Sequence, residues 1–245
     1  MLSLPSETLT ISRFLLILIL LSDTVWYNTI MAKYPVFLEL DGRRAVVIGG
    51  GAVAVRKARV LLNAGARLVV VAERIDNTMT VICQGKNAEL IQSRYTKDYL
   101  AGAVLVIAAT NNNQLNKQIY KDCQELEILC NVVDVPELCD FFVPAVVKRG
   151  DLQIAIGTEG SCPAYAGHIR KKLQKIFTEK HGQFLAELEE LRKRIIKEVA
   201  EPADRKALLG ELVDDKSFKY FIENDPQKWR TFVEGLISKF PLTRK

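Results

Sequence analysis

The amino-acid sequence predicts an α/β protein with a doubly wound, mostly parallel sheet and a helical C-terminal region. Three observations indicate this fold class. Short apolar runs alternate with helical patterns between residues 34 and 144, the order that builds parallel sheets. A run of three glycines separates the first strand pattern from the first helix pattern. After residue 163 the sequence becomes charged and amphipathic at helical spacing.

Five segments are predicted as strands and two intervening segments as helices. Leu68–Ala72 is a continuous apolar run, which is typical of a strand buried on both faces. The other predicted strands are Arg44–Ile48, Glu89–Ser93, Ala103–Ala109 and Leu129–Val133, and the helices are Ala52–Ala64 and Gln114–Glu125. Strand, turn, helix and strand within about thirty residues form a βαβ unit.

The chain beyond Pro144 has a different character. Leu152–Ile156 alternates apolar and polar residues and predicts a half-buried strand. From Ala164 onward the pattern is helical, and the next helix carries one apolar stripe, which consists of Phe184, Leu188, Leu191, Ile195 and Val199. The last forty residues, around Trp229 and Phe232, predict a further small helical piece without a readable role.

Composition sets limits on the class of protein. The chain has 245 residues, of which 49% are hydrophobic and 26% charged. This content fills a core in one or two domains and excludes a largely disordered chain. The net charge of +5 is too mild to indicate nucleic-acid binding, although it suits an acidic small-molecule ligand.

Cysteine usage indicates the redox compartment. The five cysteines form no CxxC pair, and only two histidines accompany them. A disulfide framework and a structural zinc site are therefore disfavoured, and we expect buried thiols in a reducing, cytoplasmic compartment. No residue is assigned to a resident metal.

Residues 1–30 are predicted to be a dispensable or mis-assigned extension. Phe14–Leu21 is an apolar run of eight residues, too short for a bilayer, which needs about 20. No small-residue cleavage site follows it, so a signal peptide or membrane anchor is the less favoured alternative. Met31 immediately precedes the first regular segment, which suggests that translation begins there.

The glycine-rich turn predicts a dinucleotide-binding, Rossmann-like domain. Gly49 allows a tight turn, Gly51 lets a pyrophosphate approach the backbone, and Ala54 allows close packing of helix on strand. The flanking strands and helix supply the context that this pattern requires. A purely structural glycine turn is the alternative.

Polar residues at strand ends predict the remaining contacts. Glu73 follows the second strand at the position of a ribose-binding carboxylate, which favours NAD over NADP, although the adjacent Arg74 could hold a 2′-phosphate. Thr110 and Asn111 follow the fourth strand and suit a nicotinamide or ribose, with a helix N-cap as the alternative. Asp134 follows the fifth strand and could act as a general base or be a turn residue.

Four segments together resemble the sirohaem synthase family, in particular its precorrin-2 dehydrogenase/sirohydrochlorin ferrochelatase module. They are YPVFLELDGRRAVVIGGGAVAVRKARVLLNAGARL, VIAATNNNQLN, CNVVDVPELCDFFVPAVV and LQIAIGTEGSCPAYAGHIRKKL. The resemblance covers roughly residues 34–200 and, without the family's methyltransferase domain, suggests the stand-alone enzyme. It implies NAD-dependent oxidation of precorrin-2 to sirohydrochlorin, with insertion of Fe²⁺ as a further activity. A regulatory module that only senses NAD is the rival hypothesis.

The resemblance also implies residue roles. NAD contacts fall on Ala52, Val53, Glu73 and Arg74, and the family's essential aspartate falls on Asp134, which we therefore expect to be catalytic. For the polycarboxylate substrates, precorrin-2 and sirohydrochlorin, the expected binding residues are Thr158, Ser161, Arg149 and Arg170. His168 departs from the family pattern and is expected to be packed or solvated.

The expected organisation follows from the same resemblance. Residues 31–144 form the NAD-binding domain, residues 145–172 a dimerisation segment exchanged between the subunits of a homodimer, and residues 173–245 the helical C-terminal domain. We expect neither nucleic acid nor a membrane as a partner.

Overall fold

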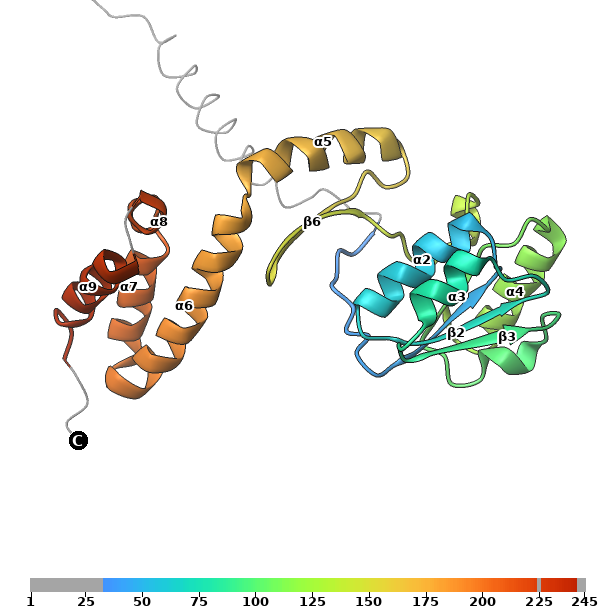
Figure 1. Ribbon diagram of the computed structural model, residues 1–245, viewed down its shortest axis with the longest axis horizontal. Coiled ribbons are helices and arrows are strands. Elements are labelled where there is room, and N and C mark those ends of the chain that lie inside the picture. The colour runs from blue at the N-terminus through green and yellow to red at the C-terminus, as the bar shows by residue number, and fades with distance from the viewer. Residues whose placement is uncertain (1–32, 224–225, 242–245) are drawn as a thin grey trace, which may run out of the picture. The chain divides into compact units, whose positions relative to one another are not determined.

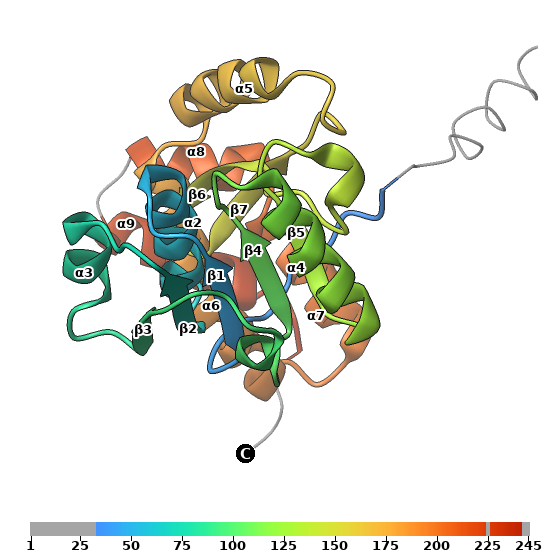
Figure 2. The ribbon, with the colours of Figure 1, turned by 90° about the vertical axis from the view of Figure 1, so that its right-hand side faces the viewer.

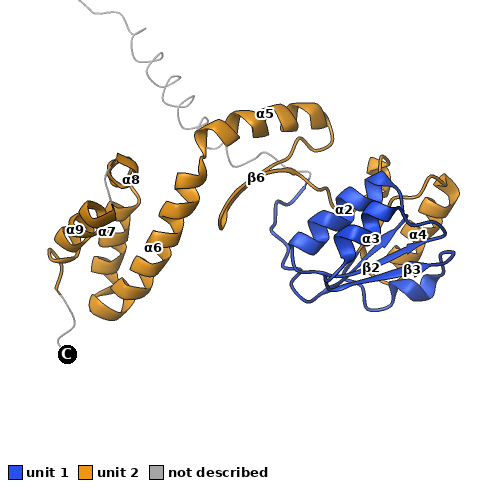
Figure 3. Ribbon diagram, in the orientation of Figure 1, with its two compact units in different colours: residues 1–105 blue, residues 106–245 orange. Residues whose placement is uncertain are grey.

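The computed structural model describes residues 33–223 and 226–241 (Figure 1). The predictions for residues 1–30 lie outside the described residues. The chain divides into two compact units, residues 1–105 and 106–245 (Figure 3).

The first unit is built on three parallel strands. β1 (Arg44–Ile48) pairs with β2 (Arg67–Ala72), and β2 pairs with β3 (Ala88–Gln92), both in parallel. Helix α2 (Ala52–Asn63) packs on β1 and β2, and α3 (Asn77–Cys83) packs beside α2, as Figure 1 shows. Because both strand faces are covered, the central residues of β1 and β2 are buried.

The sheet has five strands in the order β3-β2-β1-β4-β5, where β4 is Leu105–Ala108 and β5 is Leu129–Val132 (Figure 2). The Val104 amide donates to the Arg44 carbonyl at 2.9 Å, just before β4 begins. The Val133 amide donates to the Ala108 carbonyl at 2.9 Å, where β4 and β5 end. β4 therefore starts beside the start of β1 and ends beside the end of β5, so these strands run in the same direction. This arrangement confirms the predicted doubly wound fold.

The second unit continues with helix α4 (Asn113–Glu125), which packs on β5. A short 3₁₀ helix covers Lys97–Leu100 in the first unit, and another covers Pro136–Leu138 here. The predicted strand is present as β7 (Leu152–Ile156), and it pairs antiparallel with β6 (Ala145–Arg149). The sequence analysis did not predict β6. This strand precedes β7 in the same chain and is its pairing partner. Helix α5 (Pro163–Ile176) follows and packs on this hairpin.

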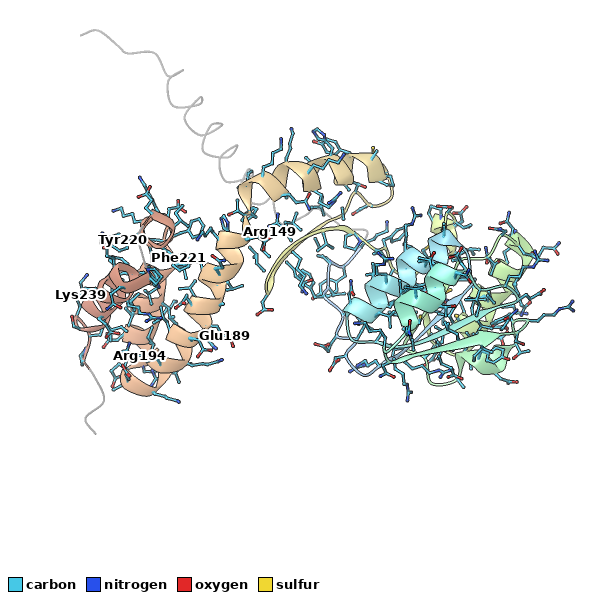
Figure 4. All side chains as sticks on the ribbon, in the orientation of Figure 1. Arg149, Glu189, Arg194, Tyr220, Phe221 and Lys239 are labelled. Carbon is cyan, nitrogen blue, oxygen red and sulfur yellow. The ribbon has the colours of Figure 1, made fainter. Side chains whose placement is uncertain are left out.

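Four helices complete the chain: α6 (Glu179–Glu198), α7 (Pro202–Leu212), α8 (Asp215–Glu223) and α9 (Pro226–Ile237). The predicted apolar stripe of α6 packs into one cluster with buried residues of α7 and α9. Phe184 contacts Phe221 and Trp229 with ring centroids 5.2 and 5.6 Å apart, and Figure 4 labels Phe221 on α8. The small C-terminal piece is thus a helical cluster with its own core. None of the helices in the described part of the chain is both long and apolar enough to cross a bilayer.

Candidate functional site

The three glycines after β1 have three different roles. Gly49 has φ +129°, a conformation that L side chains rarely adopt, and its amide donates to the Val71 carbonyl at 2.9 Å. A Cβ on Gly50 would lie 2.0 Å from the carbonyl oxygen of Arg74. A Cβ on Gly51 would meet no atom within 4 Å. Gly51 therefore faces open space, while Gly50, which the sequence analysis did not assign, is needed for packing.

The open space beside Gly51 lies at the start of α2. Gly51 is the N-cap of this helix, it has no side chain to accept from the first amides, and the first turn holds no acidic residue. The amides of Ala52 and Val53 therefore have no acceptor in their own helix. Free amides at a helix N-terminus beside an open backbone fit a pyrophosphate. Ala54 is completely buried, as close packing on the sheet requires.

Glu73 lies just beyond β2 and is paired with an arginine. Its side chain is 68% exposed, and the Oε1 atom lies 3.5 Å from Nε of Arg94, which is itself 88% exposed. Gln92, the last residue of β3, donates from Nε2 to the Glu73 carbonyl at 3.2 Å. Arg74 is exposed beside it. The sequence analysis missed Arg94; the signal was its position two residues after the neighbouring strand.

The loop after β4 forms a helix N-cap, which is one of the two alternatives given for it. The Asn112 side chain accepts from the amides of Gln114 and Leu115 at 3.0 and 3.1 Å, so Asn112 is the N-cap of α4. Thr110 is half-buried, and its Oγ1 lies 2.6 Å from Oδ1 of the buried Asn116. Asn111 is exposed between them. Thr110 is thus held by Asn116 of α4, and Asn111 is left exposed.

Asp134 has an unusual backbone conformation. Its φ is +62°, in the left-handed region where Asp and Asn are the most tolerated side-chain-bearing residues. The Val135 amide donates to the Val132 carbonyl at 3.3 Å and closes a turn directly after β5. Asp134 is exposed, and within residues 33–223 and 226–241 no hydrogen bond or ion pair to its carboxylate is recorded. The carboxylate is therefore available to a ligand.

The residues predicted to bind the substrate fall into two groups. Arg149 is only 16% exposed and lies 3.3 Å from Glu179. It donates from Nε to the Phe177 carbonyl at 2.7 Å and from NH2 to the Gln174 carbonyl at 3.1 Å. Figure 4 shows it between the β6–β7 hairpin and the start of α6. These contacts make Arg149 a structural link at the end of α5, so less of its guanidinium is available to a ligand.

The other predicted substrate residues are more accessible. Thr158 and Ser161 lie in the loop before α5, where the Ser161 amide donates to the Thr158 carbonyl at 2.8 Å. Arg170 is half-buried on α5 and donates from NH1 to Oε1 of Gln174 at 3.2 Å. His168 is exposed and stacks on Tyr165, with ring centroids 6.2 Å apart. Among the described residues, no group of three or more His, Cys, Asp or Glu side chains could hold a metal ion.

Two family models match consecutive parts of the chain. One is described as "Putative NAD(P)-binding" and matches residues 36–145. The other is described as "Sirohaem biosynthesis protein central" and matches residues 149–176. The first match covers the glycine turn and all five strands of the parallel sheet, and its description agrees with the predicted NAD cofactor.

Individual relatives agree with these models. The chain is 38% identical over 153 residues to a sirohaem synthase of Psychrobacter arcticus, covering 62% of this chain and 28% of the relative. It is 31% identical over 210 residues to the sirohaem synthase of Citrobacter koseri, covering 85% of this chain and 46% of the relative. The chain thus spans less than half of the length of these curated relatives.

A solved structure described as "SirC, precorrin-2 dehydrogenase" matches with a TM-score of 0.70 and 26% identity, covering 85% of this chain and 100% of that protein. The match therefore includes the helices after the parallel sheet as well as the sheet itself. The glycine turn, the two consecutive family models and these relatives lead to one conclusion. The chain belongs to the sirohaem synthase family, whose NAD(P)-binding and central regions it carries.

Proposed function

We propose that this protein oxidises precorrin-2 to sirohydrochlorin with NAD⁺. The observation that carries the proposal is the similarity to a precorrin-2 dehydrogenase over the whole length of that protein. Two features of this chain support it: the open backbone beside Gly51, which fits a pyrophosphate, and the exposed carboxylate of Asp134. Both follow strands of one sheet, and in such sheets ligands bind outside the carboxyl ends of the strands.

The proposed reaction removes a hydride and a proton from precorrin-2. The bound nicotinamide would supply the hydride acceptor. The amides of Ala52 and Val53 would hold the pyrophosphate, and Glu73 would accept hydrogen bonds from the ribose hydroxyls. An Oδ atom of Asp134 would take the proton from the tetrapyrrole, which is the role of a general base.

A spectroscopic time course tests this function. Precorrin-2 is mixed with the protein, first without and then with NAD⁺, and the absorbance of sirohydrochlorin and of NADH is followed. We expect both products to form together. An NAD-sensing module would bind NAD⁺ without turnover, and that result would contradict the proposal.

Insertion of Fe²⁺ into sirohydrochlorin is a further activity that we propose on the family resemblance. Iron is then a substrate, so the reaction needs no resident metal site. Supplying sirohydrochlorin and Fe²⁺ without NAD⁺ isolates this step, and the absorbance change on sirohaem formation reports it. Unchanged sirohydrochlorin would limit the protein to the dehydrogenase reaction.

We expect NAD⁺ to be preferred over NADP⁺ because Glu73 would repel a 2′-phosphate. In Glu73→Gln the repulsion is removed while Arg74 and Arg94 remain. The ratio of the Kd for NADP⁺ to the Kd for NAD⁺ should fall by about tenfold, the size of one hydrogen bond to a charged group. Titration of each variant with both dinucleotides measures the ratio.

The matched control for this prediction is Glu89→Gln, because Glu89 is also exposed on this unit but lies within β3. In Glu89→Gln the ratio of the Kd for NADP⁺ to the Kd for NAD⁺ should equal that of the wild type. If wild-type protein prefers NADP⁺, the two arginines rather than Glu73 govern the site.

We also propose a homodimer formed through residues 145–172. For its location we propose a reducing, cytoplasmic compartment, since the five cysteines of the sequence form no CxxC pair. The β6–β7 hairpin is a two-stranded sheet on its own, and such sheets need packing partners. Exposed apolar side chains line this region, where Val146 is 37% and Tyr165 58% exposed. Tyr165→Glu should therefore give monomers in sedimentation experiments, with unchanged helix content. Dimers that persist in this variant would contradict the assignment of the interface.

A further inference from the structure

The thiol of Cys139 contacts both ends of the turn that holds Asp134. The Sγ atom of Cys139 lies 3.2 Å from the Val132 carbonyl oxygen and 3.3 Å from the Val135 carbonyl oxygen. These carbonyls belong to the first and last residues of the turn that holds Asp134 at φ +62°. A thiol has one proton to donate, and here it is shared between two acceptors on either side of the aspartate.

The thiol is itself fixed from the opposite side. Asn131 is buried, with 6% of its surface exposed, and donates from Nδ2 to Sγ of Cys139 at 3.3 Å and to the Phe141 carbonyl at 2.8 Å. Both amide protons of Asn131 are thereby used. The sulfur therefore accepts from Asn131 and donates across the turn.

The backbone around this contact is also anchored. Asn131 and Cys139 form an isolated antiparallel bridge, and the Asp140 carboxylate accepts from the Cys130 amide at 2.8 Å. The segment from 136 to 140 thus folds back along β5. A left-handed conformation at a residue other than glycine persists only where its surroundings determine it strongly, and these contacts provide that determination.

We propose that Cys139, held by Asn131, is a positioning residue that fixes the Asp134 turn for proton transfer. Asp134 has no recorded side-chain partner among the described residues, so its carboxylate is placed by its backbone. The Cys139 thiol stabilises that backbone from both ends of the turn. This inference rests on the proposed function, because it assigns to Cys139 the placement of the proposed base.

Two variants separate hydrogen bonding from packing. Cys139→Val keeps an apolar side chain of similar size at this half-buried position but cannot donate. Cys139→Ser keeps a hydrogen-bond donor, the hydroxyl group, on a C–O bond that is shorter than the C–S bond of cysteine. If the thiol positions Asp134, kcat should fall about tenfold in Cys139→Val, since a misplacement of about 1 Å can cost 10²-fold. Cys139→Ser should recover most of the loss, with KM and the Kd for NAD⁺ unchanged in both variants.

The matched control is Cys83→Val, which removes another thiol from a buried position in α3, in the other compact unit. Its kcat should equal that of the wild type. If Cys139→Val is as active as the wild type, or more active than Cys139→Ser, Cys139 is only a packing residue and the inference is overturned.

A second measurement does not depend on activity. Hydrogen exchange of the Val135 amide, which bonds to the Val132 carbonyl, should be faster in Cys139→Val than in Cys139→Ser or the wild type. Equal exchange in all three proteins overturns the positioning role. If the wild-type protein does not oxidise precorrin-2, the proposed function fails, while the exchange rates still decide whether the thiol holds the turn.

Discussion

Replacement of Asp134 by asparagine is expected to slow sirohydrochlorin formation by about 10²- to 10⁴-fold, the usual contribution of a general base. Asparagine keeps the size of aspartate but cannot accept the proton. It also tolerates positive φ, so the turn at φ +62° should survive. Since no described residue has a recorded bond to the Asp134 carboxylate, Tm and the Kd for NAD⁺ should remain close to those of the wild type.

Single-turnover kinetics with precorrin-2 and saturating NAD⁺ measure this effect. Asp140→Ala provides the contrast, because Asp140 accepts from the Cys130 amide and from Nε2 of Gln124 at 3.0 Å. Its loss should lower the free energy of unfolding by about 1–3 kcal/mol. If Asp134 were only a turn residue, its replacement, like Asp140→Ala, would change the stability of the protein and not the rate of oxidation. If Asp134→Asn oxidises precorrin-2 at the wild-type rate, Asp134 is not the general base.

The same variant tests whether one site serves both proposed reactions. Sirohydrochlorin and Fe²⁺ are supplied directly, and formation of sirohaem is followed. A shared site predicts that Asp134→Asn slows metal insertion as well, because displaced pyrrole protons need an acceptor. Normal metal insertion with failed oxidation would restrict Asp134 to the dehydrogenase step.

The parallel sheet could be predicted because its signals are local in sequence. Leu68–Ala72 is a continuous apolar run since the strand is covered on both faces. The apolar stripe of α6 has the period of a helix with one packed face. The position of Asp134 after β5 follows from the strand order alone.

The missed features depend on contacts that the local residue pattern does not show. β6 has no clean alternation, and only its pairing with β7 makes it a strand. Arg94 lies 21 residues after Glu73 in the chain but comes next to it because β2 and β3 are neighbours. The spacing of the glycines after β1 likewise does not show that the carbonyl group of Arg74 lies against Gly50.

The difference between Gly50 and Gly51 gives the last prediction. Gly51→Val should fold normally, because Gly51 has φ −87°, which any residue adopts, and its Cβ would meet no atom within 4 Å. The new side chain would fill the space proposed for the pyrophosphate, so measurable NAD⁺ binding should be lost. Gly50→Ala should instead lower Tm, because its Cβ would lie 2.0 Å from the Arg74 carbonyl, an overpacking that costs about 1–3 kcal/mol or more.

Calorimetric titration with NAD⁺ and thermal unfolding of both variants measure these two effects separately. The expected pattern is opposite in the two proteins: Gly51→Val keeps its Tm and loses binding, whereas Gly50→Ala is destabilised. Gly51→Ala provides a graded control, since a single methyl group intrudes less than valine and should weaken NAD⁺ binding to a smaller extent. If Gly51→Val binds NAD⁺ as tightly as the wild type, the pyrophosphate does not lie against this turn. The free amides of Ala52 and Val53 would then have to be satisfied by water rather than by a dinucleotide.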